Sequence, residues 1–197
     1  MPLPPVTRVE AQRLKLRPLA AADLPDLLEV NGDPEVTRFL PYETWQSLAD
    51  AEAWLARMET MAASGTGQVL VLERRSDAKV IGDLLLFKYD EGSRRIELGY
   101  VLGRVHWGKG LMREAITAAC ACAFDELGIR RIEAEVNPEN LASCALLLKV
   151  GFALEGRLRK RWEAKGNAYD TNIYGWLAED RLAAGAGRQW SDHGRSE

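Results

Sequence analysis

The stretch from Glu97 to Ala115 constrains the fold of this chain more than any other, because it predicts a strand, a glycine-rich loop and the start of a long helix. Backbone N–H groups at a helix start have no partner within the helix, and the helix dipole favours negative charge there. Glycines let a phosphate approach the backbone closely. The sequence therefore predicts an anion site on residues 108–111.

Two well-known phosphate-binding patterns nearly match this loop, and each fails at one position. Residues 103–110 fit the P-loop except at its end, where Gly110 replaces the Ser or Thr whose hydroxyl holds Mg²⁺. The dinucleotide fingerprint starts at Gly108 but ends in Arg113, where a third glycine is needed for close packing of helix on strand. Neither a nucleoside triphosphate nor NAD is favoured.

Composition narrows the class of protein. The formal net charge is −3, so the chain lacks the excess of basic residues that is typical of nucleic-acid-binding proteins. Cys120, Cys122 and Cys144 form no disulfide pattern, and with two histidines they supply no zinc pattern. Because no secretion signal and no membrane-length apolar run is visible, we expect a cytoplasmic protein that binds no metal, membrane or nucleic acid.

Apolar periodicity predicts one domain over residues 13–183, between a flexible lead-in (1–12) and a flexible tail (184–197). A helix between strands 94–102 and 131–136 makes them a parallel pair, whereas the short connections between strands 68–74, 79–89 and 94–102 make those antiparallel. The further predicted elements are strands 13–17, 152–161 and 169–177 and helices 23–31, 34–40, 48–63, 111–127 and 140–150. This order predicts an α+β fold with a mixed, mostly antiparallel sheet of about six or seven strands flanked by helices.

In these surroundings the glycine loop resembles the pyrophosphate-binding motif of the GNAT superfamily, the acetyl-CoA-dependent N-acetyltransferases. That motif reads Gln/Arg-x-x-Gly-x-Gly/Ala; Gly108 and Gly110 match its last two fixed positions, and Val105 stands where Gln or Arg is usual. The segments ELGYVL (97–102), HWGKG (106–110) and VNPENLAS (136–143) extend the likeness, which covers about residues 13–178. It is strongest to the RimJ/RimL type, which acetylates protein N-termini.

The resemblance implies the GNAT fold, in which the central parallel strands splay and the pantetheine arm of acetyl-CoA enters the gap. It implies that the backbone of Tyr100, Val101 and Leu102 pairs with this arm like an added strand. It further implies that the pyrophosphate is held by backbone N–H groups at the helix start, those of Trp107, Gly108, Lys109, Gly110, Leu111 and Met112.

Transfer of an acetyl group to an amine requires a neutral amine, a polarised carbonyl and a stabilised thiolate leaving group. Glu97, on the central strand, is the predicted base, since burial would raise its pKa toward neutrality. The alternative is a carboxylate paired with Arg94, Arg95 or another basic residue.

The N-x-x-S pattern of Asn140 and Ser143 has two interpretations. The resemblance implies that Asn140 binds the cofactor arm and that Ser143 donates a proton to the leaving sulfur, with Asn137 also contacting the arm. The alternative is structural, because Asn is a good helix N-cap and Ser is common in a first helical turn.

Other reactive or charged residues are assigned structural roles. Cys144 is expected to pack rather than act as a nucleophile, because no motif places His106 or His193 as its base, so transfer should be direct. Strand alternation puts the arginines of the basic run 157–161 on one face, where they are either solvated or in contact with a 3′-phosphate or an acidic substrate.

The sequence thus predicts an acetyl-CoA-dependent N-acetyltransferase acting on a protein or peptide N-terminal amine. Two alternatives stay open: a small-molecule amine acceptor, such as a polyamine or an antibiotic, and a CoA-binding module without turnover. Only Val105 supports the module. Oligomeric state is left open, a homodimer being a family expectation.

Overall fold

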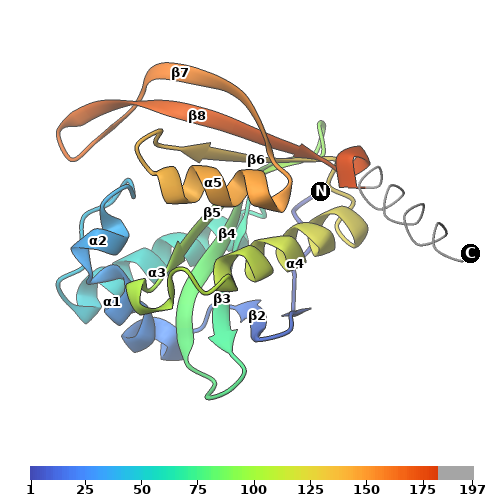
Figure 1. Cartoon of the computed structure of the whole chain (residues 1–197). Helices are drawn as coiled ribbons and strands as arrows, with labels where there is room; N and C mark the ends of the chain where they lie inside the picture. Colours follow the sequence, from blue (N-terminus) through green and yellow to red (C-terminus); the bar gives the residue numbers. More distant parts are fainter. Residues whose placement is uncertain (182–197) are drawn as a thin grey trace, which may run out of the picture.

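A computed structural model describes residues 1–181 and has an eight-stranded mixed sheet at its centre (Figure 1). The strand order is β1-β2-β3-β4-β5-β6-β8-β7, and all neighbours are antiparallel except β5 and β6. This confirms the α+β prediction. The strands are β1 (Val9–Glu10), β2 (Leu14–Pro18), β3 (Gln68–Arg74), β4 (Val80–Asp90), β5 (Arg95–Leu102), β6 (Arg131–Val136), β7 (Ala153–Ala164) and β8 (Asn167–Leu177).

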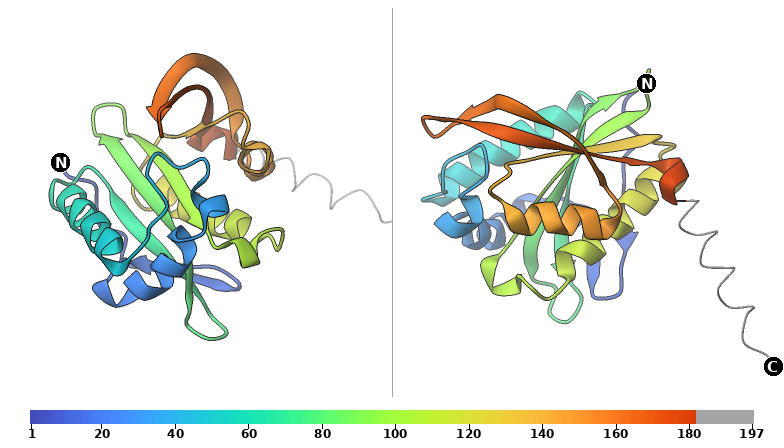
Figure 2. Two further views of the ribbon diagram at one scale, coloured as in Figure 1. Left: turned by 90° about the vertical axis from the view of Figure 1, so that its left-hand side faces the viewer. Right: turned by 45° about the horizontal axis from the view of Figure 1, so that its top comes forward.

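Helices cover both faces of the sheet (Figure 2). They are α1 (Leu24–Asn31), α2 (Pro34–Thr37), α3 (Leu48–Ala63), α4 (Leu111–Asp125) and α5 (Leu141–Val150), with short 3-10 turns at Ala21–Asp23 and Arg104–His106. Among the described residues, none of these helices has the length and apolar character needed to cross a membrane.

The alternation of β3 shows how the two faces are separated. Val69 and Val71 pack into a cluster with residues of α1 and α3, whereas Leu70 and Leu72 belong to the larger core that includes the apolar face of α4. Because successive side chains of a strand point to opposite faces, a sheet covered on both sides needs apolar residues at every position. The continuous run Val69–Leu72 meets that need.

The lead-in expected to be flexible packs against the domain instead. Leu3, Val6 and Val9 are buried, and the backbone N–H of Leu3 donates to the carbonyl of Gly65 at 2.9 Å. Strand β1 lies within this segment and adds one strand to the predicted number. The predicted tail, 184–197, lies outside the described residues.

The parallel pair at the centre of the sheet opens after three register positions. Residues 95–97 of β5 pair with residues 131–133 of β6, but β5 continues to Leu102 and β6 to Val136 without further pairing between them. Beyond Glu97 the two strands therefore diverge, which is the splay that the resemblance implies.

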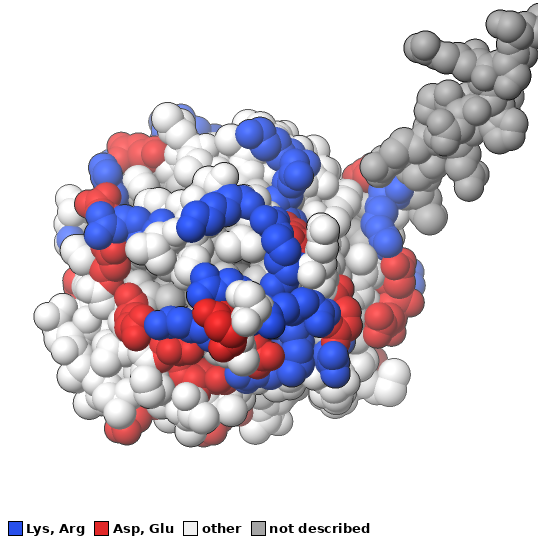
Figure 3. Space-filling view, turned by 60° about the horizontal axis from the view of Figure 1, so that its bottom comes forward, with Lys and Arg blue, Asp and Glu red and all other residues white. Residues whose placement is uncertain are grey.

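Charged side chains of both signs are intermingled on the face drawn in Figure 3. Many charges in the chain are used in ion pairs that join elements, such as Arg17 with Asp23 at 2.7 Å and with Glu73 at 2.6 Å. These pairs link β2 to β3 and to the turn before α1.

Candidate active site

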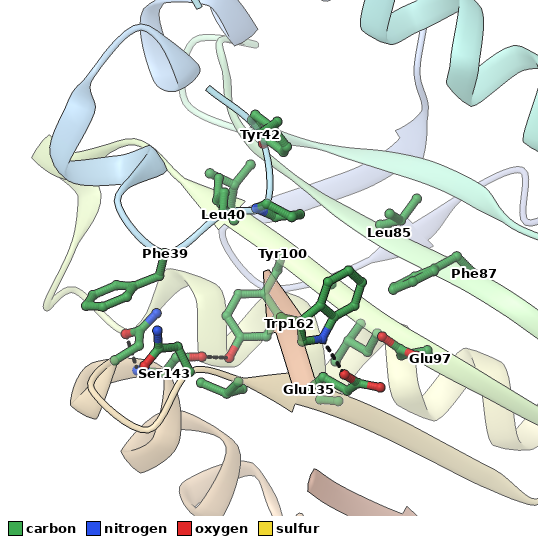
Figure 4. A pocket seen from close by; sticks show the side chains of 18 of the residues that line it. Phe39, Leu40, Tyr42, Leu85, Phe87, Glu97, Tyr100, Glu135, Ser143 and Trp162 are labelled. Carbon is green, nitrogen blue, oxygen red and sulfur yellow. Dashed lines mark hydrogen bonds between the residues drawn. The ribbon is translucent and has the colours of Figure 1, made fainter. Parts of the chain in front are cut away.

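A cavity of about 440 Å³ lies where β5 and β6 diverge (Figure 4). Its floor is one face of the β4–β5 pair, on which Asp83, Leu85 and Phe87 stand opposite Val101, Gly99 and Glu97. The walls come from the loop after α2, from α3, from the end of β6 with the start of α5, and from the β7–β8 hairpin. This volume suits a small-molecule or chain-end ligand.

Glu97 is buried in the floor of this cavity, with 6% of its surface exposed. Its Oε2 accepts a hydrogen bond from Nζ of Lys88 at 2.7 Å, whereas Arg95 pairs with Glu133 at 2.6 Å. Lys88 reaches Glu97 because β4 bulges there, with a left-handed backbone at φ 52°. Burial raises the pKa of Glu97, and the Lys88 ammonium opposes that rise. The predicted ion-pair alternative is thus present, with Lys88 as partner.

Ser143 lies in the same cavity and is held by two neighbours. Its hydroxyl is 2.6 Å from the hydroxyl of Tyr100, and the two side chains point toward each other in Figure 4. Its backbone N–H donates to Oδ1 of Asn140 at 3.1 Å. Burial raises the pKa of Tyr100, so its phenol stays protonated and can donate to Ser143. Sequence reasoning assigned only the backbone of Tyr100 a role and missed its side chain.

Asn137 and Asn140 both line the cavity while fixing local structure. Asn140 is the N-cap of α5, as the structural alternative predicted. Oδ1 of Asn137 accepts from the backbone N–H of Glu139 at 2.9 Å and stabilises the turn before that helix. Each carboxamide is therefore held at the cavity wall by the bend between β6 and α5.

The glycine loop begins where β5 ends and leads into α4, outside the residues that line the cavity. Gly108 and Gly110 have left-handed backbones, at φ 72° and 75°, and Gly110 is the N-cap of α4. A Cβ on Gly108 would meet no atom within 4 Å, so the space over the loop is open. Such a turn at the start of a fifteen-residue helix is a suitable cradle for a pyrophosphate.

Neighbouring side chains fix this loop. The indole N–H of Trp107 donates to the carbonyl of Leu102 at 2.7 Å, and Arg13 donates to the carbonyl of Lys109 at 3.0 Å. Leu111 and Met112 bury their side chains in the core, so they can offer only backbone groups. Val105 is 74% exposed.

No hydrogen bond joins Cys144 to His106 among the described residues. Sγ of Cys144, on α5, accepts a long hydrogen bond of 3.8 Å from Asn172 of β8. His106 is buried in the turn before α4 and does not line the cavity; burial lowers its pKa. Within residues 1–181 no group of three or more His, Cys, Asp and Glu side chains is placed to bind a metal ion.

The predicted alternation of the basic run 157–161 is wrong, because β7 is irregular there. Its register to β8 shifts between Leu158 and Trp162, and Lys160 has a left-handed backbone. Arg157 pairs with Asp170 at 3.0 Å, and Arg161 lies 3.4 Å from Glu135. The same irregularity directs Trp162 into the cavity, where its N–H donates to Glu135 at 2.6 Å (Figure 4).

Two buried polar side chains of the cavity were not anticipated. Asp83 on β4 is 5% exposed and Thr171 on β8 is 1% exposed. Oδ2 of Asp83 and Oγ1 of Thr171 have no hydrogen-bond partner within the described residues. The sequence held a signal for Asp83, which is the one charged residue in the apolar run from Val80 to Phe87. Thr171 gave no such signal.

Comparison with known proteins identifies the protein family that this sequence resembles. The family model described as "Acetyltransferase (GNAT) domain" matches residues 13–153. The chain is 32% identical to an uncharacterized N-acetyltransferase, p20, of Bacillus licheniformis, over 86% of this chain and 95% of that protein. It is 26% identical to spermidine N(1)-acetyltransferase of Escherichia coli strain K12, over 79% of this chain and 81% of that protein.

Solved structures give the same result. A probable GNAT-family acetyltransferase of Chromobacterium violaceum superposes with a TM-score of 0.82 at 26% identity, covering 91% of this chain and 90% of that one. Mycobacterium smegmatis RimJ, bound to CoA-disulfide, gives 0.78 at 23% identity over 90% and 94%. Spermidine N-acetyltransferase of Vibrio cholerae, bound to CoA and spermine, gives 0.75 at 24% identity over 86% and 98%. The last two likenesses show the fold alone.

Proposed function

The chain belongs to the GNAT family of acetyltransferases, and from this premise we propose that it transfers the acetyl group of acetyl-CoA to a primary amine by direct attack. The observation that carries the proposal is the splay of β5 and β6, which opens beside the left-handed glycine loop at the start of α4. Acetyl-CoA bound between the loop and the gap would have its phosphates on the loop and its acetyl end in the cavity.

The residues present suit CoA. We assign the pyrophosphate to the backbone N–H groups of residues 107–112 and the pantetheine arm to the unpaired edge of residues 100–102. The side chains of Asn137 and Asn140 complete the arm's site from the opposite wall. Bound acetyl-CoA supplies an activated acetyl group, and the remaining chemistry is moving two protons.

Glu97 is the proposed proton acceptor. The incoming ammonium must lose a proton before its nitrogen can form the new C–N bond, and Glu97 takes that proton directly or through water. Burial raises the pKa of Glu97, which strengthens it as a base, and the Lys88 ammonium opposes that rise. Glu97→Gln should lower kcat/KM at every pH at which wild type is active. Unchanged turnover across the pH range would end the assignment.

Ser143 is the proposed proton donor to the departing sulfur. As the C–S bond breaks, the hydroxyl of Ser143 gives its proton to the thiolate, and Tyr100 donates to the Ser143 oxygen as it gains negative charge. Tyr100 thus acts through Ser143. Wild-type activity in Ser143→Ala would refute the donor role.

The acceptor class stays a proposal with two members. A protein or peptide N-terminal amine is supported by the likeness of the central motifs to the RimJ/RimL type. A small-molecule amine is supported by the size of the cavity, about 440 Å³, and by the spermidine acetyltransferase relative. A panel of short peptides and alkylamines, with thiol release from acetyl-CoA as the readout, separates the two.

The amine panel, combined with a thermal-shift assay, also tests whether the protein catalyses transfer at all. Acetyl-CoA should raise the melting temperature by linkage, whereas ATP and NAD should not. Thermal stabilisation by acetyl-CoA with no thiol release for any amine would favour a CoA-binding module without turnover. The exposed Val105, where the motif usually has Gln or Arg, is the only feature that favours this alternative.

A further inference from the structure

Asp83 is a buried carboxylate that has no ion-pair partner within the part of the chain that the structure describes. It lies on β4 directly opposite Val101, on the face that forms the cavity floor. Its Oδ2 is inaccessible to solvent and without a hydrogen-bond partner within residues 1–181. An unpaired buried carboxylate is destabilising, so Asp83 does not contribute to the stability of this otherwise apolar strand.

The polar groups of the surrounding wall do not neutralise it. The hydroxyl of Tyr42 donates to Oδ1 of Asn31 at 2.8 Å instead. Arg57 of α3 also lines the cavity, but it forms no ion pair with Asp83 among the described contacts. Burial raises the pKa of Asp83 to about 7, and no cation among the described residues opposes that rise. Residues 1–181 therefore supply no group that compensates this carboxylate.

The floor carries a second carboxylate at its other end. Glu97 stands opposite Phe87, four residues along from the Asp83–Val101 pair and one strand across. Strand geometry separates the two Cα atoms by about 14 Å. Between them the floor is formed by Leu85 and Gly99, and it is apolar.

The floor has a carboxylate at each end and an apolar middle. It is therefore complementary to an extended molecule that has a cation at each end and methylene groups between them. We propose that Asp83 binds a second cationic group of the acceptor, so that the acceptor is a diamine-like molecule acetylated at its other amine. The inference rests on the proposed function for the reacting end, where Glu97 receives the proton. At the far end an ammonium would supply Asp83 with the partner it lacks.

The apolar walls fit the middle of such a molecule. Trp54 and Met58 of α3 and Leu40 of the loop after α2 face the floor residues across the cavity. A methylene chain gains burial there without a polar partner. The unpartnered hydroxyl of Thr171 adds a hydrogen-bonding group to the same cavity.

The test compares α,ω-diaminoalkanes, from butane to decane, with the monoamines of equal chain length. Wild type should prefer the diamine of at least one length. Asp83→Asn should lower kcat/KM for that diamine by about 10–100-fold, mainly through KM, and change the matching monoamine less than about threefold. Asp77→Asn, in an exposed turn, is the matched control and should behave as wild type. Equal losses for diamine and monoamine, or no loss, would overturn the proposal.

A second readout does not need turnover. Calorimetric titration of the CoA complex with the same diamine should show binding to wild type and to Asp77→Asn, and at least tenfold weaker binding to Asp83→Asn. If wild type binds the diamine in this manner but releases no thiol, acetyl transfer fails and the Asp83 assignment stands. If thiol is released and diamine affinity is the same in Asp83→Asn, the assignment fails alone. Asp83→Ser replaces Asp83→Asn should the latter not fold.

Discussion

The burial of Asp83 predicts a specific dependence of stability on pH in the absence of ligand. Its pKa is about 7 in the folded protein and returns to the ordinary value of 3.8 on unfolding. Between these values the folded state holds a proton that the unfolded state has released, so the unfolded state binds fewer protons. The contribution of Asp83 to the free energy of unfolding is therefore fully present below pH 3.8 and is lost as pH rises through about 7.

The size of this loss follows from the two pKa values. Linkage gives a total on the order of 4 kcal/mol once Asp83 is fully ionised. Between pH 5 and pH 8 the change is about 2–3 kcal/mol, since part of the loss has already occurred at the lower pH. For a domain of this length, that corresponds to roughly 5–10 °C in Tm.

Asp83→Asn isolates this term because an amide does not titrate. The cost of burying the amide is the same at both pH values and cancels when the wild-type and variant differences are compared. Urea unfolding at pH 5 and pH 8 should show the variant gaining on wild type by about 2–3 kcal/mol at the higher pH. Asp77→Asn is the control, because Arg74 lowers the pKa of Asp77 to about 2 and its titration is complete below pH 5.

A difference between wild type and Asp83→Asn that stays constant from pH 5 to pH 8 would refute the reasoning. It would mean that Asp83 is ionised and compensated in the free protein, by Arg57 or by water. In that case the cavity would hold no unpaired carboxylate for a ligand to neutralise.

Three further predictions concern the remaining parts of the site. Tyr100→Phe should lower kcat by about tenfold with little change in KM, and its effect should vanish in a Ser143→Ala background, as a double-mutant cycle of initial rates would show. Lys88→Met should move the acidic limb of the kcat/KM profile to higher pH, because removing the ammonium lets the pKa of Glu97 rise further. Gly110→Ala should lower stability by about 1–2 kcal/mol through its left-handed backbone and weaken acetyl-CoA binding, measured by thermal unfolding with and without acetyl-CoA.

The elements that follow simple periodicity were predictable. Helix α4 has an unbroken apolar face between a glycine start and a glycine stop, and it begins at Leu111 as predicted. The antiparallel order of β3, β4 and β5 follows from connections too short for crossovers. The candidate residues Glu97, Tyr100 and Ser143 also meet in one cavity, although the sequence places them more than forty residues apart at the extremes.

The unpredicted features come from long-range contacts and from irregular strands. Nothing local indicates that Leu3 finds Gly65, so the lead-in could be judged only by its prolines. The bulge at Lys88 decides which cation reaches Glu97, and the register shift in β7 decides that Trp162 enters the cavity. A period-two pattern assumes a regular strand and fails wherever an extra residue enters the ladder.

Asp83 illustrates a different kind of failure, because the group proposed to bind the acceptor was not among the candidates taken from the sequence. In a strand predicted to be buried on both faces, a single carboxylate is a conflict between sequence and fold. Such conflicts are expected at functional positions, where a group that destabilises the free protein is compensated by its ligand. Glu97 was noticed because it belongs to a motif, whereas Asp83 belongs to none. The proposal for Asp83 therefore rests on the cost of burying an unpaired carboxylate, which a motif search does not evaluate.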